Sequence, residues 1–349
     1  MKYLRILLIF IPLSIICKVF KLSELMLFIS SALAIIPLAG VMGEATEEIA
    51  AFSGPRIGGF LNSTFGNATE LIISFFALKE GLFDIVKASI AGSVIGNILL
   101  VLGASMFTGG LKFKRQTFNK NAIEVSSSML LFAVIGLVVP AIFTHTLNPE
   151  LLNTSRYERL SIGIAALMFL IYACGLYFSF YTHKDIYGTE HDEAAIARWS
   201  LKKSISILVL ATVAIALESE FLVSSVESVT KSLGISEVFV GIILIPIIGN
   251  AAEHSTAILM SIKNKMDVAI EIAIGSSLQI ILFVAPLLVF ISLLFKPMDM
   301  IFNEFELISM FVAVLIANKV SSDGESNWLE GLQLMAVYGI IAISFLVLG

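Results

Sequence analysis

The stretch Gly66-Asn67-Ala68-Thr69-Glu70 (GNATE) recurs later in the chain as Gly249-Asn250-Ala251-Ala252-Glu253 (GNAAE). The same shift along the chain, the repeat offset, pairs further residues without a gap: Glu44 with Glu227, Gly58 with Gly241, Asp84 with Asp267, and Gly92-Ser93 with Gly275-Ser276. Apolar helices share Leu and Val by chance, but Gly, Asn, Asp and Glu at one fixed spacing are not chance matches. The pattern predicts two copies of one structural unit.

The composition around this repeat is that of a membrane protein. Of the 349 residues 58% are hydrophobic and 14% charged, with a mean hydropathy of +0.96. Soluble domains have about 45–50% apolar and about 25% charged residues, so soluble enzymes, nucleic-acid binders and disordered scaffolds are excluded. The net charge of -5 comes from no acidic tail or basic arm. Cys17 and Cys174 lie in apolar stretches and form no CxxC or zinc set.

The apolar runs are continuous rather than alternating, which predicts an all-α polytopic membrane protein and no barrel. A spanning helix needs about 20 apolar residues. We predict eleven helices, at 4–20, 24–42, 58–79, 83–108, 119–144, 159–182, 202–230, 235–262, 267–295, 303–319 and 328–348. The first run resembles a signal peptide, but no small-x-small cleavage site follows it, so we expect a retained helix.

The repeat offset superposes the second predicted helix on the seventh and the fifth on the tenth, so the repeat unit has five helices. Because five is odd, the second copy enters the membrane from the opposite face. Inverted repeats of this sort mark secondary transporters with a site at the midplane. We expect an additional helix at 1–22, a first repeat at 23–182, a loop at 183–201 and a second repeat at 202–349.

The loop charges predict the orientation. Of the 22 Lys and Arg residues, 14 fall on the side of the amino terminus, which places that side in the cytoplasm and the carboxyl terminus outside. The loop at 183–201 is the longest and most polar. A solvated connection is favoured there over a regulatory cation site.

Glu70 and Glu253 lie well inside predicted helices, where an ionisable residue costs about 2.5–3.5 kcal/mol on insertion scales. Matched positions suggest a shared task; the alternative is that each is neutral and hydrogen-bonded within the bundle. Gly66 and Gly249 favour helix breaks that turn carbonyl groups toward a cavity. The other candidate ligands for a cation or protons are Asn67, Asn250, Asn97, Gln279, Ser93 and Ser276. All offer oxygen, which suits hard cations, Ca²⁺ above all.

Two uncompensated buried carboxylates are prohibitively costly. Two loaded states are neutral, one with both glutamates on a Ca²⁺ ion and one with both protonated. A protein that changes its facing state only when the site is neutral exchanges Ca²⁺ for at least two protons. Ca²⁺ and H⁺ are then transported ions, and no cofactor is expected.

Two further acidic groups are predicted near the membrane surfaces. Glu44, Glu47 and Glu48 share one helical face near the cytoplasmic mouth, where they either concentrate cations or solvate a helix end. A second set is predicted to do the same outside: Glu218, Glu220 and Glu227.

Five stretches resemble signatures of the calcium/proton exchangers of the cation/calcium antiporter superfamily: PLAGVMGEATEEIA (37–50), GNATELIISFFALK (66–79), GSVIGNILLVLG (92–103), PIIGNAAEHSTAI (246–258) and GSSLQIILF (275–283). The resemblance implies two inverted five-helix repeats with one additional helix, and proton-driven calcium transport. It implies that Glu70 and Glu253 are the paired cation- and proton-binding glutamates. It also implies that Asn97 and Gln279 are neighbouring polar positions of the site.

Within the superfamily, sodium/calcium exchangers typically carry proline just before the repeated glutamate. Thr69 and Ala252 stand there, which favours the proton-coupled branch over a sodium-coupled exchanger. The short amino-terminal segment resembles bacterial members and suggests the inner membrane. A cation channel is the alternative from another class, and a homo-oligomer is left open. An intramembrane enzyme is disfavoured because HExxH is absent.

Overall fold

The computed structural model describes residues 4–146, 154–183 and 197–348. The elements of the first half are η1 (Leu4–Ile9), α1 (Phe10–Val19), α2 (Glu24–Gly66), α3 (Ala68–Lys79), α4 (Phe83–Ile95), η2 (Gly96–Val101), α5 (Leu102–Lys112), β1 (Gln116–Thr117), α6 (Lys120–Thr146), α7 (Thr154–Tyr177) and η4 (Phe178–Thr182). Those of the second half are α9 (Leu201–Leu233), α10 (Glu237–Phe239), η5 (Val240–Leu244), α11 (Ile245–Ile262), α12 (Met266–Gln279), η6 (Ile280–Val284), α13 (Ala285–Ser292), α14 (Glu304–Val320), β2 (Glu325–Ser326) and α15 (Trp328–Leu348).

Within these described residues, seven helices are long and apolar enough to cross a membrane, or eight if the bent pair from Glu237 to Ile262 is one span. The remaining predicted spans coincide with shorter helical segments, so the number eleven stays a prediction. Two of these spans have the largest buried share: the most apolar window of Phe83–Lys112 is 89% buried and that of Met266–Ser292 is 72% buried. Both come from equivalent parts of the repeat.

The region 43–57 differs from its prediction. The hydropathy predicts a connection between helices at 24–42 and 58–79, but α2 is continuous from Glu24 to Gly66. The sequence GEATEEIAAF (43–52) is polar enough to end an apolar run, yet Ala and Glu are strong helix formers. Loss of hydropathy therefore marks where the membrane-spanning part ends, and the helix itself continues. The predicted loop at 183–201 lies mostly outside the described residues.

The repeated asparagine separates two helices in the first half and stands at a bend of the helix in the second half. The helix α2 ends at Gly66 and α3 begins at Ala68, so Asn67 separates them. In the second half the helix axis bends by 61° between Glu237–Gly249 and Ala251–Ile262, with Asn250 at the bend. The predicted interruption is present in the first half, and in the second half α11 bends at Asn250 without ending there.

Of the four π-helical segments in the described residues, two lie at equivalent positions of the two halves. The first, η2, covers Gly96–Val101, and the second, η6, covers Ile280–Val284. The repeat offset places 97–101 on 280–284. Short π-helical insertions within α-helices are frequent at functional sites, and both segments belong to the two spans with the largest buried share.

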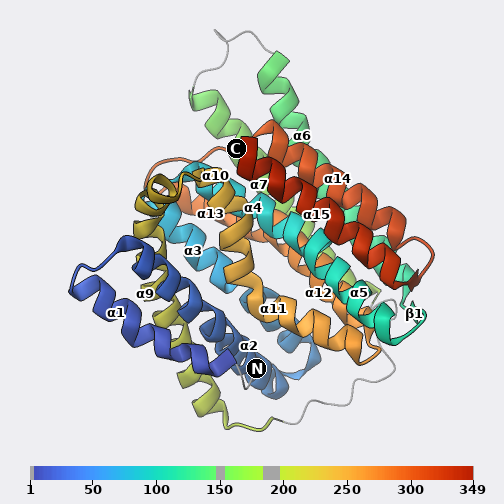
Figure 1. Cartoon of the computed structure of the whole chain (residues 1–349). Coiled ribbons are helices and arrows are strands. Elements are labelled where there is room, and N and C mark those ends of the chain that lie inside the picture. The colour runs from blue at the N-terminus through green and yellow to red at the C-terminus, as the bar shows by residue number, and fades with distance from the viewer. Residues whose placement is uncertain (1–3, 147–153, 184–196, 349) are drawn as a thin grey trace.

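The central helices come from both halves of the chain. In Figure 1, α1, α2 and α9 lie on one side and α14 and α15 on the other, with α3, α4, α5, α11 and α12 between them. The helix α4 crosses η5 closely: a Cβ atom at Gly92 would overlap the backbone of Ile242, and one at Gly241 would lie 2.7 Å from Ala88 Cβ. Glycine at both positions permits this crossing.

Segments predicted on one membrane side contact one another. At one end of the bundle β1 pairs antiparallel with β2, and Lys112 Nζ donates to the Ile262 carbonyl over 2.9 Å. At the other end Lys87 Nζ lies 2.6 Å from Asp299 Oδ1. Helices that cross a membrane in alternating directions require this grouping of loops.

Candidate functional site

The two repeated glutamates each lie against the glycine of the other stretch. Glu70, in the first turn of α3, is only 3% exposed. A Cβ atom added at Gly249 would lie 3.1 Å from Glu70 Oε1, and one added at Gly66 would lie 2.9 Å from Glu253 Oε1. Each glycine therefore leaves the space that the glutamate from the opposite half occupies. The structure brings the two carboxyl groups to one crossing of helices.

The two repeated asparagines make reciprocal hydrogen bonds between the halves. Ser276 Oγ donates to Asn67 Oδ1 over 2.7 Å, and Asn250 Nδ2 donates to Ser93 Oγ over 3.3 Å. The repeat offset converts one pair into the other. Asn250 Nδ2 also lies 3.2 Å from the Pro246 carbonyl oxygen. The four predicted polar residues thus fix the broken helices of each half to the neighbouring helix of the other.

Three other contacts at the site have no equivalent in the other half. Asn67 Nδ2 donates to Gln279 Oε1 over 2.5 Å, and Gln279 Nε2 donates to the Tyr172 hydroxyl over 3.3 Å. On the other side, His254 Nε2 lies 3.2 Å from Asn97 Oδ1. The predicted residues Gln279 and Asn97 are therefore at the site, although they do not correspond to each other in the repeat.

Several buried oxygen atoms of the site lack a donor. Within the described residues, both carboxylate oxygens of Glu70, Oε2 of Glu253 and Oδ1 of Asn250 are buried without a hydrogen bond. Buried polar atoms in native proteins are normally satisfied. All four are oxygens that a proton or a hard cation would satisfy, so the donor set fits the predicted ions.

The number of acidic ligands is small. No group of three or more His, Cys, Asp or Glu side chains that could hold a metal occurs in the described part of the chain. A cation here would be bound by two carboxylates together with amide, hydroxyl and carbonyl oxygens. Such a mixed oxygen set is the kind that Ca²⁺ takes.

The predicted acidic mouth on the cytoplasmic side differs from its expectation. Glu44 Oε2 lies 2.6 Å from Arg5, and Glu48 accepts from Arg198 Nε over 2.9 Å and from the Arg198 and Trp199 backbone amides. Glu48 is buried, whereas Glu47 is exposed. Two of the three carboxylates are thus engaged by arginines here, an arrangement that spacing along one helix cannot reveal.

The predicted outer group is also only partly correct. Glu220 is exposed, and Glu227 is exposed and lies 2.6 Å from Lys231 Nζ. Glu218, however, is 1% exposed, with Oε1 2.7 Å from Ser14 Oγ. It does not line a mouth, because α1 covers it. The sequence could not show which helix packs against that face of α9.

Two residues of the site, Tyr172 and His254, are not among those predicted from the sequence. His254 directly follows the repeated Glu253, and this position could have marked His254 as a residue of the site. Tyr172 has a weaker signal, because it is one of several hydroxyl groups in α7, and it is 8% exposed.

We expect Tyr172→Phe to weaken Ca²⁺ binding several-fold while the protein stays folded. The change removes the acceptor of the Gln279 amide, and a hydrogen bond of this kind contributes about 1 kcal/mol. Gln279 in turn orients Asn67 beside Glu253. The half-saturating Ca²⁺ concentration, compared with that of Tyr177→Phe on the same helix, measures the effect; equal values for the two variants would contradict it.

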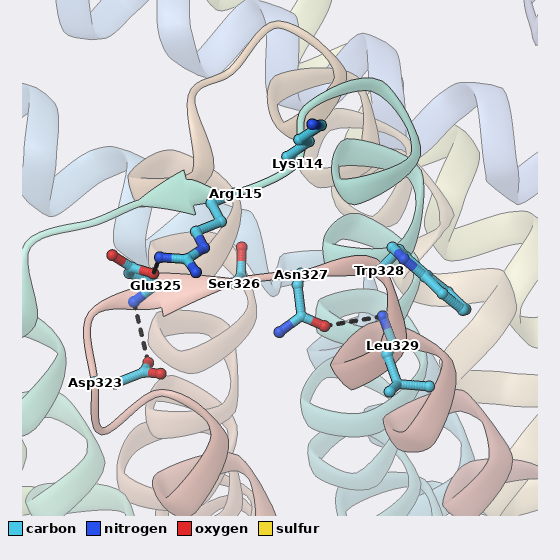
Figure 2. A pocket seen from close by; sticks show the side chains of 8 residues that line it. All are labelled: Lys114, Arg115, Asp323, Glu325, Ser326, Asn327, Trp328 and Leu329. Carbon is cyan, nitrogen blue, oxygen red and sulfur yellow. Dashed lines mark hydrogen bonds and ion pairs between the residues drawn. The ribbon is translucent and has the colours of Figure 1, made fainter.

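A surface pocket lies away from these residues. Figure 2 shows this cavity of about 490 Å³ where the β1–β2 pair meets the start of α15. Several of its charged and polar groups contact one another: Arg115 lies 3.3 Å from Glu325, and Asn327 Oδ1 accepts from the Leu329 amide over 3.0 Å. It contains none of the predicted site residues.

Apolar helices of spanning length, broken or bent beside two carboxyl groups from different halves, define a polytopic integral membrane protein with the architecture of an ion transporter. The family described as "Sodium/calcium exchanger protein" matches residues 23–181 and 203–347. The chain therefore belongs to this family.

Individual relatives agree with the resemblance that the motifs predicted. The Ca²⁺/H⁺ antiporter ChaA of Bacillus subtilis (strain 168) is 48% identical over 344 residues, 97% of each chain. The Ca²⁺/H⁺ antiporter of Aphanothece halophytica is 46% identical over 355 residues, covering 97% of this chain and 95% of its own. The structure of native YfkE superposes with a TM-score of 0.87 at 45% identity, covering 99% of this chain and all of that one. The predicted resemblance to calcium/proton exchangers is confirmed.

Proposed function

We propose that the protein is a secondary active transporter that exchanges Ca²⁺ for H⁺ by alternating access. The observation that carries the proposal is the reciprocal placement of Glu70 against Gly249 and of Glu253 against Gly66, with buried oxygens lacking donors. Two relatives that share nearly the whole chain bear the name Ca²⁺/H⁺ antiporter, which supports the same pair of ions.

In this mechanism the two carboxylates bind either one Ca²⁺ ion or two protons. Both loaded states are neutral, whereas an empty site leaves two uncompensated charges in a low-dielectric interior. The change of facing state is therefore restricted to the loaded states, and this restriction couples the two ions. Asn67 and Asn250 stand at the helix interruptions, where they support both the ligand geometry and the bend of each helix.

We further propose that the chain consists of one additional helix at 1–22 and two inverted five-helix repeats, at 23–182 and 202–349. Three pairs of features related by the repeat offset support this: the interruptions at Asn67 and Asn250, the π-helical segments η2 and η6, and the reciprocal Asn–Ser hydrogen bonds. The site then lies at the interface between the repeats.

The proposed orientation has the amino terminus in the cytoplasm and the carboxyl terminus outside, in a bacterial inner membrane. The excess of Lys and Arg on the amino-terminal side supports it. In Figure 1 the start of η1 and the end of α15 lie at opposite ends of the bundle, which fits an odd number of crossings.

Uptake of ⁴⁵Ca²⁺ into everted membrane vesicles tests the function. A pH gradient, acid inside, is expected to drive uptake without sodium, and collapsing that gradient is expected to stop it. Uptake that needs sodium and is indifferent to pH would select a sodium-coupled exchanger instead. Flux without any counter-movement of protons would select a channel.

The proton stoichiometry gives a separate prediction. If two protons must leave before one Ca²⁺ ion binds, the half-saturating Ca²⁺ concentration rises by about 100-fold for each unit of pH lost on the acid side of the titration. Proteoliposomes at a series of external pH values measure this slope. A limiting slope of about tenfold per pH unit would mean that a single proton competes with the ion.

A further inference from the structure

A buried carboxyl group lies outside the site described above. Glu218 stands near the middle of α9 and is 1% exposed, and Ser14, in α1, is fully buried against it. Oε1 of Glu218 lies 2.7 Å from Ser14 Oγ, and Oε2 is buried without any hydrogen bond in the described structure. The repeat offset places Glu218 on Ile35, so the first half has no equivalent of this carboxyl.

The single hydroxyl hydrogen of Ser14 indicates the protonation state of Glu218. Ser14 Oγ lies 2.8 Å from the Ile11 carbonyl oxygen as well as 2.7 Å from Glu218 Oε1. A serine hydroxyl has one hydrogen, so it cannot fully serve two acceptors. If Ser14 donates to the Ile11 carbonyl, as hydroxyls in helices commonly do, the hydrogen between Ser14 and Glu218 belongs to the carboxyl group. A protonated Glu218 provides a hydrogen for each of the two contacts.

Among the side chains that the structure describes, none of the surrounding groups is a cation that would stabilise the ionised form. On α9 itself no Lys or Arg stands between Lys203 and Lys231, and on α2 no titratable residue stands between Glu24 and Glu44. The other described titratable groups on α9 and on the elements packed against it either have another partner or lie elsewhere. Those with a contact of their own are Arg5 with Glu44, Lys18 with Ser224, Arg198 with Glu48, Glu227 with Lys231, Glu70 against Gly249 and Lys203 over the Trp199 ring. The remaining ones are Cys17, which is buried, Glu220, which is exposed, Glu47, which lies near the start of α9, and Glu24, Lys79, Lys202 and Glu237, which lie near helix ends.

We propose that Ser14 and Glu218 form a proton-binding site separate from the Glu70–Glu253 site, and that its proton holds α1 against α9. With the proton in place, a chain of donation runs from the Glu218 carboxyl through the Ser14 hydroxyl to the Ile11 carbonyl. Loss of the proton leaves a negative charge in a contact with no positive partner, which is strongly unfavourable in an apolar interior. The contact between α1 and α9 therefore loosens as the pH rises. This inference does not depend on the exchange of Ca²⁺ for H⁺.

Infrared difference spectroscopy of the purified protein in liposomes tests the proton directly. The wild type minus Glu218→Gln is expected to show one protonated-carboxyl C=O band that disappears at alkaline pH, and the wild type minus Glu220→Gln no such band. Glu220 is the matched control because it is an exposed carboxylate two residues along the same helix. Ser14→Ala is expected to keep the band and shift its frequency, which also tests the site if Glu218→Gln does not fold. No difference between the wild type and either Glu218→Gln or Ser14→Ala in this region would overturn the proposal.

Electron paramagnetic resonance tests the contact between the helices. Spin labels at Leu13→Cys and Leu217→Cys report the separation of α1 from α9; both residues are exposed, and the exposed Cys174 is replaced by Ala. The distance distribution is expected to lengthen at alkaline pH when Glu218 is present and to stay unchanged in Glu218→Gln. The same distribution at all pH values in both proteins would overturn the role of the proton in holding α1.

Discussion

Glu70→Gln and Glu253→Gln, each alone, are expected to lower pH-gradient-driven Ca²⁺ uptake by about 100-fold or more. Each change keeps the size of the side chain but leaves Ca²⁺ with a single compensating carboxylate. Removing one partner of a buried charge pair costs about 3–5 kcal/mol, and each 1.4 kcal/mol is about tenfold in affinity. Uptake of ⁴⁵Ca²⁺ into everted vesicles measures the loss.

The matched control for this loss is Glu124→Gln. Glu124 is an exposed carboxylate near the start of α6, and its amide variant is expected to transport normally. The thermal stability of the three purified variants separates loss of binding from unfolding. Full uptake by either Glu70→Gln or Glu253→Gln would refute the assignment of the site.

Gly66→Ala and Gly249→Ala are expected to raise the half-saturating Ca²⁺ concentration by about tenfold or more, which corresponds to about 1.4 kcal/mol. The added methyl group in the first variant would lie 2.9 Å from Glu253 Oε1, and that in the second 3.1 Å from Glu70 Oε1. Each carboxylate must therefore move, and binding sites depend on positions held to within about 0.5 Å. Alanine favours helix more than glycine does, so general helix destabilisation does not explain the effect.

Two other glycines give the control for these variants. Gly43, on α2, and Gly163, on α7, have no heavy atom within 4 Å of an added Cβ among the described residues, so Gly43→Ala and Gly163→Ala are expected to keep the wild-type affinity. Equilibrium ⁴⁵Ca²⁺ binding to purified protein compares all four. Equal affinities for Gly66→Ala and Gly43→Ala would show that the glycine does not position Glu253.

The sequence predicted much of the site because its polar residues are conspicuous in an apolar chain. Glu70, Asn67 and Ser93 recur with their equivalents at one offset, and the structure brings these residues together. Which residue bonds to which was beyond prediction. The pairing of Asn67 with Ser276, and of Asn250 with Ser93, depends on how the two halves cross, and a pattern along the chain carries no distance between distant segments.

The errors concern residues whose surroundings are supplied by distant helices. Glu218 was expected at an outer mouth, but α1 buries it, and Glu44 and Glu48 were expected as an acidic face, but Arg5 and Arg198 engage them. The continuity of α2 was missed for a different reason. Hydropathy reports where a helix leaves the membrane, whereas the propensity of the individual residues determines where it ends.

The mutual fit of each glutamate with the glycine of the other half has a consequence for building hybrid proteins. Neither half forms the site alone, because the glutamate of each half occupies the space beside the glycine of the other half. A chimaera joining residues 23–182 of this chain to the second half of a relative keeps a working site only if that relative has glycine opposite Glu70 and an acid that reaches Gly66. The glutamate of one half and the glycine of the other must consequently change together.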